Sequence, residues 1–260
     1  MSLLRLFRPR GPCGTCCSVL AYAMTMAVLA WAVLRGAENM GYNWQWFRIP
    51  RYLLAPDGGP GPLLQGAGMT LLISAMGFVG ASILALATAL LRLSRSTVGR
   101  ALARTYLEVI RNTPLLVQIF FIYFVLGPLF DLNRLAAAVL ALALFEGAYA
   151  SEVIRAGILA IPKGQWEGAL SLGMRTVDVY LHVILPQALR HVLPPLTSQG
   201  VSLIKDSALV STIAIFDLTM HGQAIVAETF LSFEVWFTVA AIYLVFTLLL
   251  SSLARTMERV

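Results

Sequence analysis

The stretch Glu167-Gly168-Ala169-Leu170-Ser171-Leu172-Gly173, followed by Leu185-Pro186, is a polar, glycine-containing segment inside an otherwise hydrophobic chain. Of the 260 residues, 58% are hydrophobic and only 12% are charged. Because a soluble globule of this size needs more polar surface, the composition indicates a membrane protein. We therefore expect residues 160–190, which lie between two apolar runs, to contact something in the water.

Apolar runs long enough to form a membrane-spanning helix occur six times. A spanning helix needs roughly 20 apolar residues at about 1.5 Å rise per residue. Helices are expected rather than a barrel, because the alternation over about ten residues that marks barrel strands does not recur. The sequence thus predicts an all-α membrane protein with about six transmembrane helices. The expected spans are residues 18–34, 63–91, 107–130, 135–154, 193–215 and 235–253.

The basic residues of the connecting segments predict the orientation of the chain. Lysine and arginine gather on the cytoplasmic side of membrane proteins. We therefore expect both termini and the polar loop to be cytoplasmic in a bacterial inner membrane. The net charge of +6 needs no nucleic-acid partner, because anionic membrane lipid attracts the same residues. Thirteen basic residues lie on one side, namely Arg5, Arg8, Arg10, Arg92, Arg95, Arg100, Arg104, Arg155, Lys163, Arg175, Arg190, Arg255 and Arg259, against Arg35, Arg48, Arg51 and Arg134 on the other.

The N-terminal region, residues 1–62, is expected to be an extra transmembrane helix followed by a periplasmic loop. A cleaved signal peptide is the alternative, because arginines precede an apolar run that contains Ala30-Trp31-Ala32. The length of the run and the tryptophan, which suits an interfacial anchor, favour a retained helix. Cys13, Cys16 and Cys17 lack a nearby histidine and make a poor zinc site, so free thiols are expected, with lipidation as the alternative.

The polar loop is expected to form two short helices at an angle. Pro162 suits the first turn of the first helix, and Gly173 suits its C-terminal end. A second helix is predicted over residues 176–183, ending near Pro186. Both should lie on the cytoplasmic face of the membrane.

The loop resembles that of the permeases of ATP-binding-cassette (ABC) importers. Their shared motif reads Glu-Ala-Ala, three residues, Gly, nine residues, Ile, one residue, Leu-Pro. The chain departs from it at Gly168, where the motif has alanine, and at Val183, where it has isoleucine. Gly168 should loosen the first short helix by up to about 1 kcal/mol. The residues that match at the required spacing are Glu167, Ala169, Gly173, Leu185 and Pro186.

The resemblance continues outside the loop and covers about residues 63–255. It points to the polar amino-acid branch, which includes histidine, glutamine, glutamate and arginine importers. It implies a type I ABC importer permease (MetI-like) fold for residues 63–255, with the coupling loop at 160–190. The further stretches that carry it are Arg111–Gln118, Tyr149–Gly157, Ile184–Ala188 and Lys205–Ser211.

The resemblance also implies a mechanism. The first short helix would rest in a groove of an ATPase subunit, with Glu167 and Gly173 at the contact. Closure of two ATPase subunits would then move paired permeases between inward- and outward-facing states. No catalysis or cofactor is expected in this chain, and no Gly-x-x-x-x-Gly-Lys phosphate-binding motif occurs in it. The ATPase should therefore be a separate polypeptide.

Four polar residues fall near the middle of expected spans, where such residues are costly and suggest function. They are Gln118, Glu146, Lys205 and Asp206. If their helices pack together, one cavity would present groups suited to a zwitterionic amino acid, and breaks at Pro194-Pro195 and Gly200 would free backbone groups for contacts with it. Structural pairing is the alternative, with Glu146 bound to Lys205 across the bundle.

Two further pairs are expected to be structural only. Glu152 and Arg155, three residues apart, should form a local ion pair, and the same interpretation applies to Glu108 and Arg111.

Two other functions compete with the importer. An ion-coupled secondary transporter would use intramembrane carboxylates, but such proteins usually have more spans and an inverted repeat, which is not detected here. An intramembrane enzyme is disfavoured because no His-Glu-x-x-His or serine–histidine pattern appears. A chain with six helices makes half of a pathway, so a homodimer or a pair with a sister permease is expected. The resemblance adds a periplasmic solute-binding protein as a partner and a polar amino acid as the substrate.

Overall fold

The computed structural model describes residues 12–39 and 41–257. The chain divides into two compact units, Met1–Gln45 and Trp46–Val260. In the first unit, helix α1 (Pro12–Asn39) carries the apolar stretch Ser18–Ala32, which covers most of the first expected span. The side chains of the three cysteines lie outside the described part of the structure, so their role stays a prediction.

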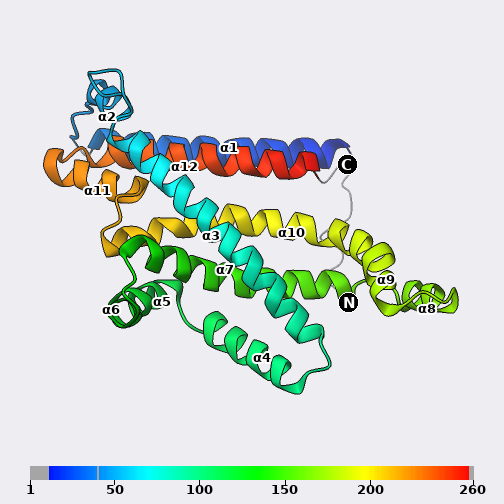
Figure 1. Ribbon diagram of the computed structural model, residues 1–260. Helices are drawn as coiled ribbons and strands as arrows, with labels where there is room; N and C mark the ends of the chain where they lie inside the picture. Colours follow the sequence, from blue (N-terminus) through cyan, green and yellow to red (C-terminus); the bar gives the residue numbers. More distant parts are fainter. Residues whose placement is uncertain (1–11, 40, 258–260) are drawn as a thin grey trace. The chain divides into compact units, whose positions relative to one another are not determined.

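The second unit is built from helices of very different lengths (Figure 1). The four longest are α3, α7, α10 and α12. The short α8 and α9 lie at one end of this unit, and α2 and α11 lie at the other (Figure 1). Outside an isolated bridge between Leu54 and Pro60, the described residues contain no β-structure. The elements are η2 (Trp46–Arg48), α2 (Pro50–Leu53), α3 (Pro62–Leu93), α4 (Thr97–Arg111), α5 (Leu115–Phe120), η3 (Phe121–Leu126), α6 (Gly127–Phe130), α7 (Arg134–Leu159), α8 (Lys163–Ser171), α9 (Thr176–Val179), η4 (Tyr180–Ile184), α10 (Leu185–Asp206), η5 (Ser207–Ile213), α11 (Leu218–Thr229) and α12 (Ser232–Met257).

Three helices in the described part of the chain are long and apolar enough to cross a membrane: Pro62–Leu93, Arg134–Leu159 and Ser232–Ser252. They match the second, fourth and sixth expected spans. The bent helix pair Thr97–Arg111 and Leu115–Phe130 raises this number to four if the pair counts as one span. The fifth expected span, 193–215, is divided between α10 and η5. Length and composition therefore identify fewer spans than the six expected.

Small residues allow α3 and α7 to pack closely. A Cβ atom on Gly80 would lie 2.9 Å from Cβ of Ala143, and one on Gly147 would lie 3.0 Å from Cβ of Leu84. Between helices in a bilayer the hydrophobic driving force is weak, so close contact of this kind supplies much of the attraction. The core beside this contact consists of Ile73, Leu115, Ile119, Ile122, Ala137, Ala138, Ala141, Leu142, Val210, Ile213 and Ile215.

Replacing Gly80 by leucine is expected to destabilise the α3–α7 contact by about 2 kcal/mol, because overpacking forces the helices apart. The variant should melt at a lower temperature than the wild type in detergent. Gly68→Leu is the control, since Gly68 lies on the same helix with open space around it. If both variants melted alike, the contact would contribute little to stability.

The third expected span is a bent pair of helices. Helix α4 meets the segment Leu115–Phe130 at an angle of 107°. Pro114 precedes α5 with extended backbone (ψ 139°), because the residue before a helix needs no helical geometry. The Gln118 side chain holds the bend by donating a hydrogen bond to the carbonyl of Ile110 at 2.8 Å. The expectation of one helix over 107–130 is therefore wrong.

Helix α10 continues through Pro194 and Pro195. The breaks expected at these prolines and at Gly200 are wrong, because the helical backbone accommodates the missing N–H groups. Each proline still removes one hydrogen bond, which leaves the carbonyls of Arg190 and His191 without their usual helical donors.

Asp217 caps the N-terminus of α11. Its Oδ1 atom accepts a hydrogen bond from the backbone N–H of Met220 at 2.8 Å. The side chain is fully buried and lies outside the helices that are long enough to span a membrane. Burial raises the pKa of Asp217 to about 6.

This shift predicts a pH dependence of folding stability. An unfolded aspartate has a pKa of about 3.9, so the folded chain holds the proton more tightly between about pH 4 and pH 6. The stabilising contribution is present below about pH 4 and is lost as the pH rises through about 6, with an upper limit of about 3 kcal/mol.

Asp217→Asn should remove this dependence while keeping the cap, since asparagine is a good N-cap residue. Melting temperatures at about pH 4 and pH 7 test the prediction, with the exposed Asp57→Asn as control. An unchanged pH profile in Asp217→Asn would contradict it.

Candidate coupling loop and substrate site

The polar loop after α7 begins with a short helix that is capped at its C-terminal end. Helix α8 follows Pro162, its N-cap residue, and ends before Gly173, whose φ of 77° lies in the left-handed region. The N–H of Gly173 donates to the carbonyl of Leu170 at 3.0 Å, and that of Met174 donates to Ala169 at 3.3 Å. This is a Schellman motif, which glycine adopts without steric cost. The predicted short helix between Pro162 and Gly173 is confirmed.

The second half of the loop differs from the prediction. Helix α9 begins at Thr176, as expected, but it continues through the π-helix η4 directly into α10. Pro186 lies in the first turn of α10 and does not end a helix. The expected helix end near Pro186 is therefore wrong.

One side of the loop packs against the long helices. Ala169 of α8 is only 6% exposed and lies in a buried apolar cluster. The rings of Trp166 and Tyr180 meet edge to face, with centroids 4.8 Å apart, and tie α8 to η4. The loop is thus fixed to the end of α7 and the start of α10. The other buried members of the cluster are Ile158, Ile161, Val179, Ile184 and Ala188.

The opposite side of α8 faces outward. Glu167 and Gly168 are exposed, and among the described residues the Glu167 carboxylate has no hydrogen-bond or ion-pair partner. Leu170 and Leu172 follow on this surface and are 50% and 84% exposed, and Val177 on α9 is 62% exposed. An exposed apolar surface beside a free carboxylate fits a protein contact. We call these five residues the outer loop face.

The six residues predicted to couple to the ATPase therefore take different places. Glu167 and Gly168 belong to the outer loop face, and Gly173 is exposed beside it. Ala169 lies on the buried side of α8, Leu185 is half-buried at the start of α10, and Pro186 beside it is exposed. Of these residues, Ala169 anchors the loop from inside, as part of the buried apolar cluster.

The structure brings together two of the four predicted substrate residues. Glu146 on α7 is 3% exposed, and Asp206 on α10 lies within hydrogen-bonding reach of its carboxyl group. Gln199, also on α10, donates a hydrogen bond from Nε2 to Oε2 of Glu146 at 3.2 Å. A cavity of about 60 Å³ borders Glu146 and Gln199 between α3, α7 and α10. This volume suits a few water molecules, and an amino acid would need the helices to separate.

The other two predicted residues lie elsewhere. Gln118 is buried, and its Nε2 atom bonds the carbonyls of Ile110 and Thr113 and the hydroxyl of Thr113 at 2.8 to 3.0 Å. This side chain holds the bend between α4 and α5. Lys205 is exposed and forms no ion pair with a carboxylate in the described part of the chain. The alternative pairing of Glu146 with Lys205 is therefore not observed.

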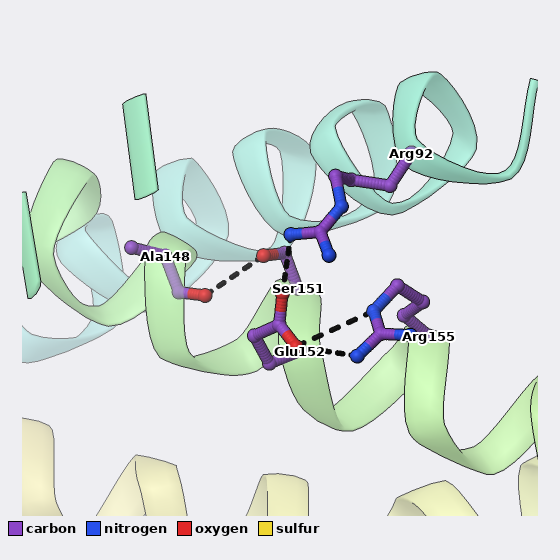
Figure 2. Close-up of polar contacts among 5 residues, drawn as sticks. All are labelled: Arg92, Ala148, Ser151, Glu152 and Arg155. Carbon is purple, nitrogen blue, oxygen red and sulfur yellow. Dashed lines mark hydrogen bonds and ion pairs between the residues drawn. The ribbon is translucent and has the colours of Figure 1, made fainter. Parts of the chain in front are cut away.

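An ion-pair cluster connects α3 to α7 at the end of the bundle near α8 (Figure 2). The carboxylate of Glu152 on α7 forms ion pairs with two guanidinium groups. That of Arg92 on α3 lies 2.7 Å from it, and that of Arg155 on the same helix lies 2.8 Å from it. The local pair of Glu152 and Arg155 is confirmed, and the link to α3 is an addition that the sequence did not suggest.

The local pair expected between Glu108 and Arg111 is not formed. Arg111 instead lies over the ring of Tyr149, 5.4 Å from its centroid. Glu108 accepts a hydrogen bond from the side chain of Asn112 at 3.2 Å. The bend after α4 explains the difference, since the helix ends at Arg111 and both side chains find partners near its end.

Sequence reasoning missed Gln199 and the leucines of the outer loop face. Gln199 precedes Asp206 by seven residues, which is two helical turns and therefore the same face of α10. That spacing could have identified Gln199 as a neighbour of Asp206. For Leu170 and Leu172 the signal was the presence of leucines in a polar loop. Among the described residues, no group of histidine, cysteine, aspartate or glutamate side chains could hold a metal ion.

These features together define a multi-pass membrane transport permease, with polar side chains buried inside the bundle and an exposed polar loop at one end. The chain belongs to the family described as the binding-protein-dependent transport system inner membrane component, whose profile matches residues 77–259. Family membership supports the ABC importer permease over an ion-coupled transporter.

Two curated relatives illustrate the similarity. The glutamine transport system permease protein GlnP of Escherichia coli (strain K12) is 40% identical over 200 residues, which are 76% of this chain and 91% of that protein. The L-cystine transport system permease protein TcyB of Bacillus subtilis (strain 168) is 42% identical over 202 residues, 76% of this chain and 86% of that protein.

Solved structures agree on the fold. A structure described as an amino acid ABC transporter with histidines superposes with a TM-score of 0.76 at 36% identity, covering 84% of this chain and 99% of that chain. An inward-facing MetNI methionine ABC transporter superposes with a TM-score of 0.66 at 19% identity, covering 76% and 95%. The predicted all-α permease fold of the type I, MetI-like kind is confirmed.

Proposed function

We propose that this chain is the permease subunit of an ATP-driven importer of polar amino acids, driven through the outer loop face by a separate ATPase. The observation that carries the proposal is the construction of the loop. It presents outward a carboxylate that has no partner among the described residues, together with exposed apolar side chains, and it packs its inner side on α7 and α10. The glutamine and cystine permeases named above support an amino-acid substrate.

The carboxyl groups of Glu146 and Asp206 supply the chemistry for such a substrate. The pair Glu146 and Asp206 would attract the ammonium group of an amino acid, and Gln199 would add an amide. Gln118 would act indirectly, through the bend that it holds. Lys205, which is exposed, would reach the substrate only in another conformation.

The orientation and the partners complete the proposal. With the basic segments in the cytoplasm, α8 faces the cytoplasm and both termini lie there. A second copy or a sister permease would form the other half of the pathway. A periplasmic solute-binding protein would deliver the amino acid.

Uptake by proteoliposomes that contain the permease, its ATPase and its binding protein tests the function. A mixture of labelled L-amino acids is supplied outside, ATP inside, and the transported species are identified by chromatography. We expect uptake that requires ATP and persists when ionophores abolish the ion gradients. Uptake that continues without the ATPase and stops with the ionophores would identify an ion-coupled transporter instead.

A further inference from the structure

A second, larger cavity, open to the surface along α4, lies between α3, α4 and α7, at the end of the bundle near α8. Its volume is about 620 Å³, and charged side chains from all three helices line it. Tyr149 and Glu152 of α7 border this cavity, whereas Glu146 borders the small one. Six residues separate Glu146 from Glu152, which is about 9 Å along a helix.

The cavity holds more positive charge than its own carboxylates neutralise. Arg92 is paired with Glu152, and Arg111 lies over the aromatic ring of Tyr149. Arg104 has no hydrogen-bond or ion-pair partner among the described residues. Two guanidinium groups, those of Arg104 and Arg111, are therefore available to an anion.

A carboxylate shares the same surface of α4. Glu108 lies four residues after Arg104 and three before Arg111, so the three side chains follow one face of the helix. The carboxylate of Glu108 accepts one hydrogen bond from Asn112, which leaves capacity for a further donor. The cavity thus offers separate positive and negative groups on one wall.

We propose that this cavity is a second amino-acid site, on the cytoplasmic side of Glu146, in which Arg104 and Arg111 bind the α-carboxylate and Glu108 binds the α-ammonium group. Guanidinium groups suit this role because they form paired hydrogen bonds with carboxylates. The site rests on the proposed amino-acid import. It holds the amino acid after passage through the bundle, and amino acid that accumulates in the cytoplasm occupies it and slows further import.

The test uses the complete transporter in proteoliposomes with ATP inside. The interior, which corresponds to the cytoplasm, also receives an unlabelled mixture of L-amino acids at increasing concentration. Initial uptake of the labelled mixture is then measured. Internal amino acids should slow uptake by the wild type, and Arg104→Gln should need about tenfold more of them for the same inhibition, because it loses charge-assisted hydrogen bonds. Arg104→Lys, which keeps the charge, should show a smaller shift.

Arg100→Gln is the matched control. Arg100 lies one turn earlier on α4, bonds the carbonyl of Ser94 at 3.1 Å and does not line the cavity. It should respond like the wild type. Equal responses of the Arg104→Gln and Arg100→Gln variants, or a wild type that internal amino acids do not slow, would overturn the inference.

Two other results would also overturn it and assign the cavity differently. Loss of co-purified phospholipid from Arg104→Gln, with an unchanged response to internal amino acids, would indicate a lipid phosphate site. Dissociation of the permease pair in Arg104→Gln would indicate a subunit interface. If the wild type showed no ATP-dependent amino-acid uptake, the proposed function itself would fail. If the wild type showed normal uptake that internal amino acids did not slow, only the second site would be contradicted.

Discussion

Glu167→Lys is expected to leave the permease folded in the membrane but to abolish its co-purification with the ATPase. Glu167 is exposed and has no partner in the described part of the chain, so its charge is available only to a neighbouring subunit. Reversal of this charge at the contact with the ATPase should weaken ATPase binding at least about 30-fold, or about 2 kcal/mol. Pull-down of the tagged ATPase from detergent extracts measures the loss, and ATP-driven uptake should fall with it.

Asp57→Lys provides the matched control for this charge reversal. Asp57 is exposed in the turn after α2, at the end of the second unit away from α8, and accepts a hydrogen bond from the N–H of Gly59. This variant should retain the ATPase. A Glu167→Lys protein that still assembled and transported would show that the coupling role assigned to α8 is wrong.

The second large effect is expected at the buried carboxyl groups. Glu146→Gln keeps the size of the side chain and can still meet Gln199, but it removes the carboxyl group that would bind the ammonium group of an amino acid. We expect uptake in proteoliposomes to fall at least about 100-fold, since a lost charge-assisted contact at this depth costs several kcal/mol. Binding of the ATPase should stay unchanged.

Ser82→Ala separates the loss of the carboxyl group from a change in packing. Ser82 lines the same cavity as Glu146, and its hydroxyl bonds the carbonyl of Phe78 within its own helix. This variant should transport like the wild type. Normal uptake by Glu146→Gln would exclude the carboxyl pair from substrate binding, and a loss of uptake in both variants would point to packing instead.

Most of the fold could be predicted because it depends on hydropathy and on local signals. Three spans coincide with single long helices, and α8 lies between the proline and the glycine that mark its ends. The bend of 107° after α4 could not be predicted in this way. It depends on hydrogen bonds from Gln118 to a preceding turn, and hydropathy contains no information about such contacts.

The candidate sites likewise contain some residues that the sequence identifies and others that it does not. Glu167 was found because the loop matches the motif of ABC importer permeases, and Glu146 was found because charge is unusual near the middle of a span. The exposed position of Lys205 could not be predicted. Side chains of adjacent helix residues point about 100° apart, and the depth of a residue in its span does not say which way its side chain points. The cavity around Arg104 was missed for a related reason. Its arginines looked like membrane-side charges, and only the packing of three helices brings them to one space.

The way the loop is anchored has a mechanical consequence. Helix α8 rests on residues from the end of α7 and the beginning of α10, such as Ile158 and Ala188. The same two helices carry Glu146 and Gln199. A displacement of α8 would therefore reach both helices at once, and it would move the two sides of the proposed substrate site relative to each other.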